Sequence, residues 1–212
     1  MNELFLGGKG AEGAGGTGLL TGLAVGEVTD NKDPNGLARV RVRLPGHGAG
    51  TSYWARTAMP MAGSGRGTYF LPEIGDEVLV GAAGGDPSHL YVLGMLWNGK
   101  AKPPADNSDG KNDRRVIRSR SGHELMFDDG AKPTVELKLK DGKRLKLDSD
   151  GVLVEDEKGN RLTILSNSGE ITIESKASLK LKSQSISIEA GATMEIKATG
   201  ALTLKGAMVQ IN

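Results

Sequence analysis

The chain of 212 residues contains no cysteine, which excludes disulfide bridges and thiolate metal sites. Aromatic residues make up only 4% of it, fewer than a single compact core of this size normally carries. The formal net charge is +1, so no bulk electrostatic field indicates nucleic acid or an anionic membrane as the partner. Long apolar runs are also missing: "LFL" near the N-terminus is too short for a signal peptide, and no stretch approaches a membrane span. We therefore expect cytoplasmic synthesis without a signal peptide.

Glycine, in contrast, is abundant at 32 residues, which indicates many turns and thin cores. Residues 1–20, with the run "GGKGAEGAGGTG", are expected to form a flexible N-terminal arm. A GxGxxG pattern occurs there at Gly13, Gly15 and Gly18. No strand leads into it and no amphipathic helix follows, so it does not predict a dinucleotide site. No cofactor is expected.

Residues 21–99 show short strand patterns separated by Gly, Pro, Asn and Asp turns, which predict a small closed barrel of the OB-fold type. The expected strands are 23–29, 37–44, 53–59, 68–71, 77–82 and 89–96. In the second of them Arg39, Arg41 and Arg43 alternate with aliphatic residues. This row is typical of a solvated strand face or a subunit contact, and the alternative is a track for phosphates. A carbohydrate- or nucleic-acid-binding module is accordingly the alternative function for this domain.

Residues 100–115, rich in Pro, Asp and Asn, are expected to form a linker. The segment "DNSDGKND" within it superficially resembles a calcium loop. Aligning Gly110 with the loop glycine puts Ala105 at the first ligand position and Val116 at the twelfth, which excludes an EF-hand. The sequence indicates no metal site.

Residues 116–212 are expected to form a repeat domain, since from Leu137 onward pairs of apolar residues separated by one residue recur along the chain. Successive pairs begin 7 to 10 residues apart, with turn-forming residues such as "DG", "KGN" and "NSG" between them, which indicates a repeat architecture. The residues expected to form an apolar axis are Leu137, Leu139, Leu145, Leu147, Val152, Val154, Leu162, Ile164, Ile171, Ile173, Leu179, Leu181, Ile186, Ile188, Met194, Ile196, Leu202 and Leu204.

Three arrangements would use such a repeat. A meander within one chain would leave an apolar face uncovered and two sheet edges free. A single-chain solenoid of about three coils, with roughly 23 residues in each, would enclose a dry core. Three copies wound around one axis would form a C3 trimer in which each chain pairs with its neighbours rather than with itself. The repeat lengths leave the last two open, and the position of the repeat after a small barrel favours the trimer.

The motifs resemble a known family along nearly the whole chain from residue 22 onward. In the barrel they are "GEVTDNKDPNGLARVRVRLPG", "WART", "LPEIGDEVLV" and "GDPSHLYVLGMLWNG"; "RSRSGHELMFDDG" (118–130) and "LTLKGAMVQIN" follow. The chain resembles the central spike proteins of contractile injection machines, phage baseplate assembly protein V and the VgrG spikes of type VI secretion. The resemblance implies an all-β fold, an OB-fold barrel followed by an intertwined trimeric β-helix. It also implies a membrane-puncturing needle at the tip of a contractile tail tube, in a phage tail or an injection particle.

Departures from the family pattern lead to expectations about partners. VgrG chains carry a large hub domain before the barrel, where this chain has only the arm, so a separate hub or baseplate protein is expected at the N-terminal end. Some spikes insert a lysozyme domain between barrel and needle, for which the linker leaves no room. Some needles end in a His-x-His iron apex, but His47, His89 and His123 all lie far from the C-terminus. A separate PAAR-like tip protein is expected to dock on Val209, Gln210, Ile211 and Asn212.

Only one local cluster of titratable groups invites an enzymatic interpretation, His123 and Glu124 beside Asp128 and Asp129. Catalysis needs convergent groups in a cleft that excludes water. The cluster has no nucleophile beside it, and in the resembling family it lies at a structural junction. The sequence therefore predicts a structural protein rather than an enzyme.

Overall fold

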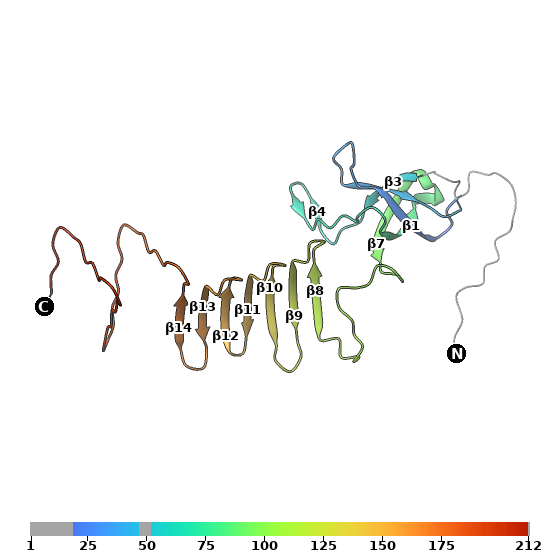
Figure 1. Cartoon of the computed structure of the whole chain (residues 1–212). Coiled ribbons are helices and arrows are strands. Elements are labelled where there is room, and N and C mark those ends of the chain that lie inside the picture. Colours follow the sequence, from blue (N-terminus) through green and yellow to red (C-terminus); the bar gives the residue numbers. More distant parts are fainter. Residues whose placement is uncertain (1–18, 47–51, 212) are drawn as a thin grey trace. The chain divides into compact units, whose positions relative to one another are not determined.

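The computed structural model describes residues 19–46 and 52–211, so most of the expected arm, His47 and Asn212 lie outside the described residues. The chain divides between Lys111 and Asn112 into two compact units. Each unit has its own sheet, and the two are described separately below (Figure 1).

The first unit is a closed barrel of five strands in the order β1-β2-β3-β7-β6. Its strands are β1 (Leu23–Asp30), β2 (Arg39–Arg43), β3 (Ser52–Thr57), β6 (Glu77–Ala82) and β7 (Leu90–Leu96). β3 and β7 pair in parallel, and the other neighbours are antiparallel. A small closed all-β barrel is what the turn-punctuated strand pattern predicted.

The barrel core consists almost entirely of small and β-branched aliphatic side chains at alternating strand positions. Such side chains pack well on a pleated surface and fill a narrow barrel without large rings. The buried hydrophobic residues are Val28, Val40, Val42, Leu44, Ala55, Val78, Val80, Leu90 and Val92. The low aromatic content therefore reflects a core built mainly of valine.

The expected strand at residues 68–71 is wrong. The preceding glycine-rich segment instead forms a minimal hairpin of β4 (Ala62–Gly63) and β5 (Arg66–Gly67), with Gly65 at a positive φ of 65° in its turn. Tyr69 and Phe70 follow it as exposed residues outside any strand. Pro72 comes next and has no N–H, so it cannot extend a strand ladder from this stretch. Two short 3-10 turns, η1 (Ala83–Gly85) and η2 (Pro87–His89), join β6 to β7.

The second unit contains one sheet of seven antiparallel strands, each paired with the next along the chain (Figure 1). They are β8 (Arg114–Arg118), β9 (Glu124–Asp128), β10 (Thr134–Lys138), β11 (Arg144–Asp148), β12 (Gly151–Glu155), β13 (Arg161–Leu165) and β14 (Glu170–Glu174). β8 begins at Arg114, within the segment that the sequence assigned to the linker. Each strand has five residues. Because consecutive strands are antiparallel, the chain reverses direction after every one.

Glycines make these reversals possible. Gly142, in the Asp-Gly turn between β10 and β11, has a φ of 100°, and its N–H donates to the carbonyl oxygen of Leu139 at 3.0 Å. At Gly151 a Cβ atom would lie 1.8 Å from the carbonyl oxygen of Ile164, so no other residue fits that position. Over residues 114–174 the chain therefore pairs with itself. The expectation that it pairs only with neighbouring copies is wrong for this segment, and antiparallel neighbours also exclude a solenoid there.

The self-paired sheet ends at Glu174, although the apolar repeat continues. Residues 175–211 contain no strand in the single chain. Gly191, Gly200 and Gly206 lie in this segment, and none of them has the positive φ that marks the hairpin turns of the sheet. The segment thus has the period of a strand repeat without the turns that would fold it onto itself.

Candidate functional site

The apolar residues of the second unit line up in two parallel rows on one face of the sheet. Residues directly opposite each other on neighbouring strands point to the same face. One row comprises Ile117, Leu125, Leu137, Leu145, Val154, Leu162 and Ile173. The other comprises Phe127, Val135, Leu147, Val152, Ile164 and Ile171. We call these two rows together the apolar face.

No other strand or helix in the described part of the second unit packs on the apolar face. Nine of its thirteen side chains are between 36 and 65% exposed, which is unusual for large apolar side chains gathered on one face. A groove of about 600 Å³ runs along the first row, from Leu137 through Val154 to Ile173, and Leu179 beyond the last strand also lines it. The apolar face is therefore the most prominent candidate for binding in this unit.

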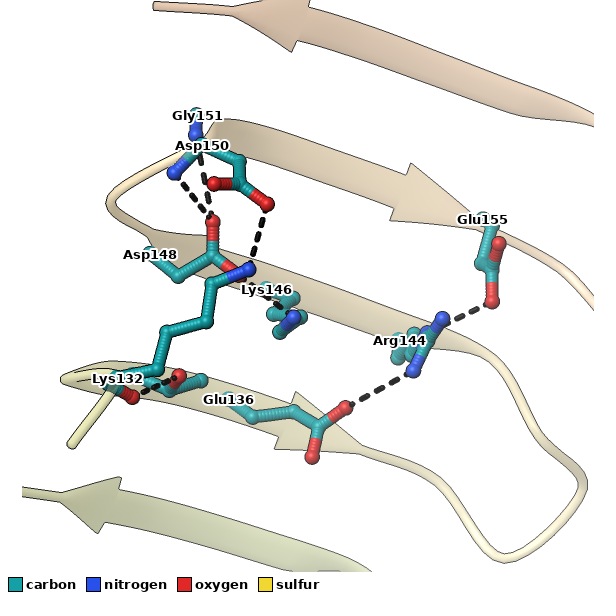
Figure 2. A network of polar contacts seen from close by, with 9 residues as sticks. Lys132, Glu136, Arg144, Lys146, Asp148, Asp150, Gly151 and Glu155 are labelled. Carbon is teal, nitrogen blue, oxygen red and sulfur yellow. Dashed lines mark hydrogen bonds and ion pairs between the residues drawn. The ribbon is translucent and has the colours of Figure 1, made fainter. Parts of the chain in front are cut away.

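The opposite face of the sheet is mostly polar, although Val116, Met126, Leu153 and Leu165 also lie on it, and its charged groups neutralise one another (Figure 2). Arg144 bridges two neighbouring strands, with its guanidinium 2.7 Å from Glu155 and 3.5 Å from Glu136. Arg161 and Glu174 repeat this pairing two strands further along the sheet, at 2.8 Å. Cross-strand pairs of opposite charge stabilise a sheet and remain well hydrated in water. This face is suited to solvent, in contrast to the apolar face.

Asp148 lies at the centre of a second group of charges on the polar face (Figure 2). Lys146 contacts it at 2.6 Å, and Lys132 contacts both Asp148 and Asp150, at 3.4 and 2.5 Å. The Lys146 ammonium, followed by the backbone N–H of Asp150, holds the pKa of Asp148 well below its usual range. A similar pair raises the pKa of Lys143 to about 12 through Asp141 and Glu157. These groups are all stabilised in their charged forms, which suits a solvated face rather than acid–base chemistry.

The cluster that invited an enzymatic interpretation does not converge. Glu124 and Asp128 stand at opposite ends of β9, roughly 13 Å apart along an extended strand. Each carboxylate has its own arginine: Arg118 pairs with Glu124, Arg114 with Asp128 at 3.2 Å, and Arg115 with Asp129 at 3.0 Å. The His123 ring accepts a hydrogen bond from the backbone N–H of Lys140 at 3.3 Å. Each of the four residues therefore has its own separate contact in or next to the strands, and together they do not form a reaction centre.

The predicted axis residues are distributed over two different environments. Those from Leu137 to Ile173 lie on the apolar face, except Leu139, which follows the end of β10. Those from Leu179 to Leu204 lie in the segment without strands, where their exposures range from 48 to 69%. Of the expected docking residues, Val209 and Ile211 are 52 and 86% exposed, Gln210 is exposed, and Asn212 is not described.

Sequence reasoning missed four members of the apolar face, Ile117, Leu125, Phe127 and Val135. The signal was clear in "TVELK", where Val135 and Leu137 alternate with polar residues, but adjacent apolar residues in "RRVIR" and "ELMFD" obscure the period of two. They were missed because the repeat was counted from Leu137, after the segment that resembles the family junction. The sheet actually starts two strands earlier.

The arginine row of the barrel is partly neutralised. Arg39 forms an ion pair with Asp33 at 2.8 Å, and Arg43 forms one with Glu27 at 2.5 Å. Carboxylates thus stand beside two of the three arginines, which argues against a continuous phosphate track. The described residues contain no group of three or more His, Cys, Asp or Glu side chains that could hold a metal ion. No helix in the described part of the chain is long and apolar enough to cross a membrane.

Comparisons with known proteins agree with this architecture. Residues 24–97 match the model of the type VI secretion system/phage-baseplate injector OB domain. The chain is 30% identical over 130 residues to the type VI secretion system spike protein VgrG4b of Pseudomonas aeruginosa, a match that covers 52% of this chain and 16% of the relative. It is 27% identical over 124 residues to the spike protein VgrG3 of Vibrio cholerae, covering 54% and 12%. The chain thus spans less than a fifth of either relative, and its resemblance to VgrG-like spike proteins is confirmed.

Proposed function

We propose that this VgrG-like chain is a structural spike of a type VI or phage-type injection machine, and that it works as a trimer. The observation that carries the proposal is the apolar face: two continuous apolar rows are left bare on a sheet whose other face is mostly charged. A sheet of this kind needs a cover, and residues 114–211 contain no helix and no second sheet that could supply one.

The free energy available from covering this face is large. Full burial of one Leu, Ile, Val or Phe side chain contributes about 1.5–3 kcal/mol, and nine such side chains of the apolar face are about half exposed. Covering them would stabilise each copy by on the order of 10 kcal/mol, comparable with the whole stability of a typical domain. Such a gain favours an obligate assembly over a transient contact.

Other copies of the chain are the occupant that fits best. Three sheets can turn their apolar faces toward a common axis and their charged faces toward water, and C3 symmetry closes the arrangement. In this proposal residues 114–174 form a three-sided prism of self-paired sheets. Residues 175–211 then form the intertwined β-helix, in which each strand pairs with neighbouring copies. The absence of intrachain strands there, despite the continuing apolar pairs, supports this division.

The mechanism would be mechanical. Many backbone hydrogen bonds around a dry aliphatic axis must break together before the needle yields, so it would be stiff enough to puncture a membrane when a sheath contracts. The barrel would sit against a separate hub or baseplate protein. The exposed aliphatic pair Val209 and Ile211 would offer a platform to a PAAR-like tip protein. The function requires no catalysis, cofactor or metal of its own.

Mass in solution is the decisive measurement. Light scattering is expected to report about 67 kDa, three times the 22.2 kDa of one chain. A monodisperse species of 22 kDa would contradict both the covered apolar face and the spike function. A stable dimer would keep the covered face but contradict the three-sided needle.

A further inference from the structure

The outer surface of the barrel carries a cleft of about 410 Å³ where β2, β3 and β7 lie side by side. Its lining includes Leu37, Arg39, Trp54, Arg56 and Tyr91. We call it the arginine cleft. Arg41 stands beside it, since its guanidinium lies 5.7 Å from the centre of the Trp54 ring.

Strand register fixes the order of these side chains. Arg41 is directly opposite Trp54, Arg39 is opposite Arg56, and Arg56 is opposite Tyr91. Arg41 and Arg56 are therefore diagonal neighbours on one face, a relation that puts Cα atoms about 7–8 Å apart. The spacing is set by the sheet and not by flexible loops.

The two diagonal arginines have no carboxylate partner of their own. Arg39 pairs with Asp33 at 2.8 Å and His89 with Asp86 at 3.1 Å. Neither Arg41 nor Arg56 forms an ion pair with any residue in 19–46 or 52–211. Both side chains are exposed, so an incoming anion can reach either guanidinium.

Aromatic rings hold these guanidinium groups in place. Those of Arg39 and Arg41 lie 5.5 and 5.7 Å from the centre of Trp54, and that of Arg56 lies 5.8 Å from the centre of Tyr91. Stacking on a ring restricts a long side chain before any partner arrives, which lowers the entropic cost of binding. It also means that these ring faces already have a cationic group against them, so they are not free platforms for nucleobases.

We infer that the arginine cleft binds an extended acidic segment of another protein, through two carboxylates placed two residues apart. Residues i and i+2 of a strand point to the same side about 6.5–7 Å apart, which matches the diagonal spacing of Arg41 and Arg56. The fork-shaped guanidinium pairs well with a carboxylate, and Leu37, 67% exposed, offers an apolar contact beside them. Asp33, Glu27 and Asp86 along the same surface make a continuous nucleic-acid backbone the poorer occupant. The inference rests on the barrel alone and stands or falls independently of the trimeric needle.

Trp54 supplies a direct reporter. The chain has two tryptophans, so a Trp97→Phe variant leaves Trp54 as the only one. The probe is a short synthetic peptide with two glutamates separated by one valine, titrated against the full-length protein while Trp54 fluorescence is recorded. A peptide of the same composition with adjacent glutamates is the spacing control. We expect saturable binding of the first peptide and at least threefold weaker binding of the second.

The variant R41E/R56E is expected to weaken binding of the first peptide at least tenfold. Arg66→Glu, a single charge reversal on the exposed β5, should leave the affinity unchanged. Equal affinity in all variants, or the absence of saturable binding, would overturn the inference. So would tighter binding of an oligothymidylate than of the peptide at 150 mM salt. If R41E/R56E instead changes the mass in solution, the cleft is a contact between copies of this chain and not a site for another protein.

Discussion

Replacing Ile171 by aspartate tests whether the apolar face is covered. Ile171 lies on β14 in the second apolar row and is 65% exposed in the single chain. If the chain were a monomer, the substitution would be a surface change with an effect within about ±0.5 kcal/mol. If three copies face one axis, it would place three carboxylates in one layer of a dry core.

The magnitude in the trimer follows from two contributions. Each buried, unpaired carboxylate costs several kcal/mol, even after relaxation and water penetration. Each copy also loses about 1–2 kcal/mol of aliphatic burial at Ile171. Three copies together lose on the order of 10 kcal/mol or more, which is comparable with the total stability of many domains. We therefore expect the trimer to dissociate or to lose its cooperative melting transition.

Thr172→Asp is the matched control, one residue further along the same strand and on the polar face. Its cross-strand partner is Thr163, so the new charge meets no buried aliphatic group. Light scattering and thermal melting of both variants decide the matter. A trimer that tolerates Ile171→Asp as well as Thr172→Asp would refute the inward orientation of the apolar face.

Three further predictions concern the rest of the chain. Ile188→Asp should abolish the trimer or sharply lower its melting temperature, whereas Ser187→Asp should change little; equal tolerance would mean that the inward phase of residues 175–211 is misassigned. Asp148→Asn should lower the melting temperature at pH 7, because Lys146 holds the folded-state pKa of Asp148 below its unfolded value of about 3.9. The stabilisation is present above that value and lost as the pH falls below about 4, so the two proteins should converge there; a constant difference down to pH 2 would exclude the ion pair as its source. Deleting Met208–Asn212 should weaken binding of a candidate tip protein in pull-down assays, and unchanged binding would place the tip contact elsewhere.

Local patterns were enough to predict most of the barrel. Alternation along "RVRVR" and "EVLVGA" corresponds to β2 and β6, because each strand buries every second residue in the same small core. The strand expected at residues 68–71 also failed for a local reason: the glycine-rich segment before it forms its own hairpin, and Pro72 after it cannot extend a strand ladder. The sequence pattern did not reveal the ion-pair partners of the arginine row, because Asp33 lies in a turn and Glu27 lies on another strand.

The sequence by itself determined that this is an all-β protein with a barrel and an apolar strand repeat, since period and turn chemistry are local properties of the chain. It also carried the resemblance to injection-machine spikes. Only the tertiary structure decided that Arg114 to Glu174 fold into a self-paired meander with both apolar rows on one face. Pairing depends on whether each turn can reverse the chain, and a pattern of period two is the same whether the neighbouring strand belongs to the same chain or to another copy. Beyond Glu174 the period continues without intrachain strands. In the proposed trimer, neighbouring copies would supply the hydrogen-bond partners of that segment.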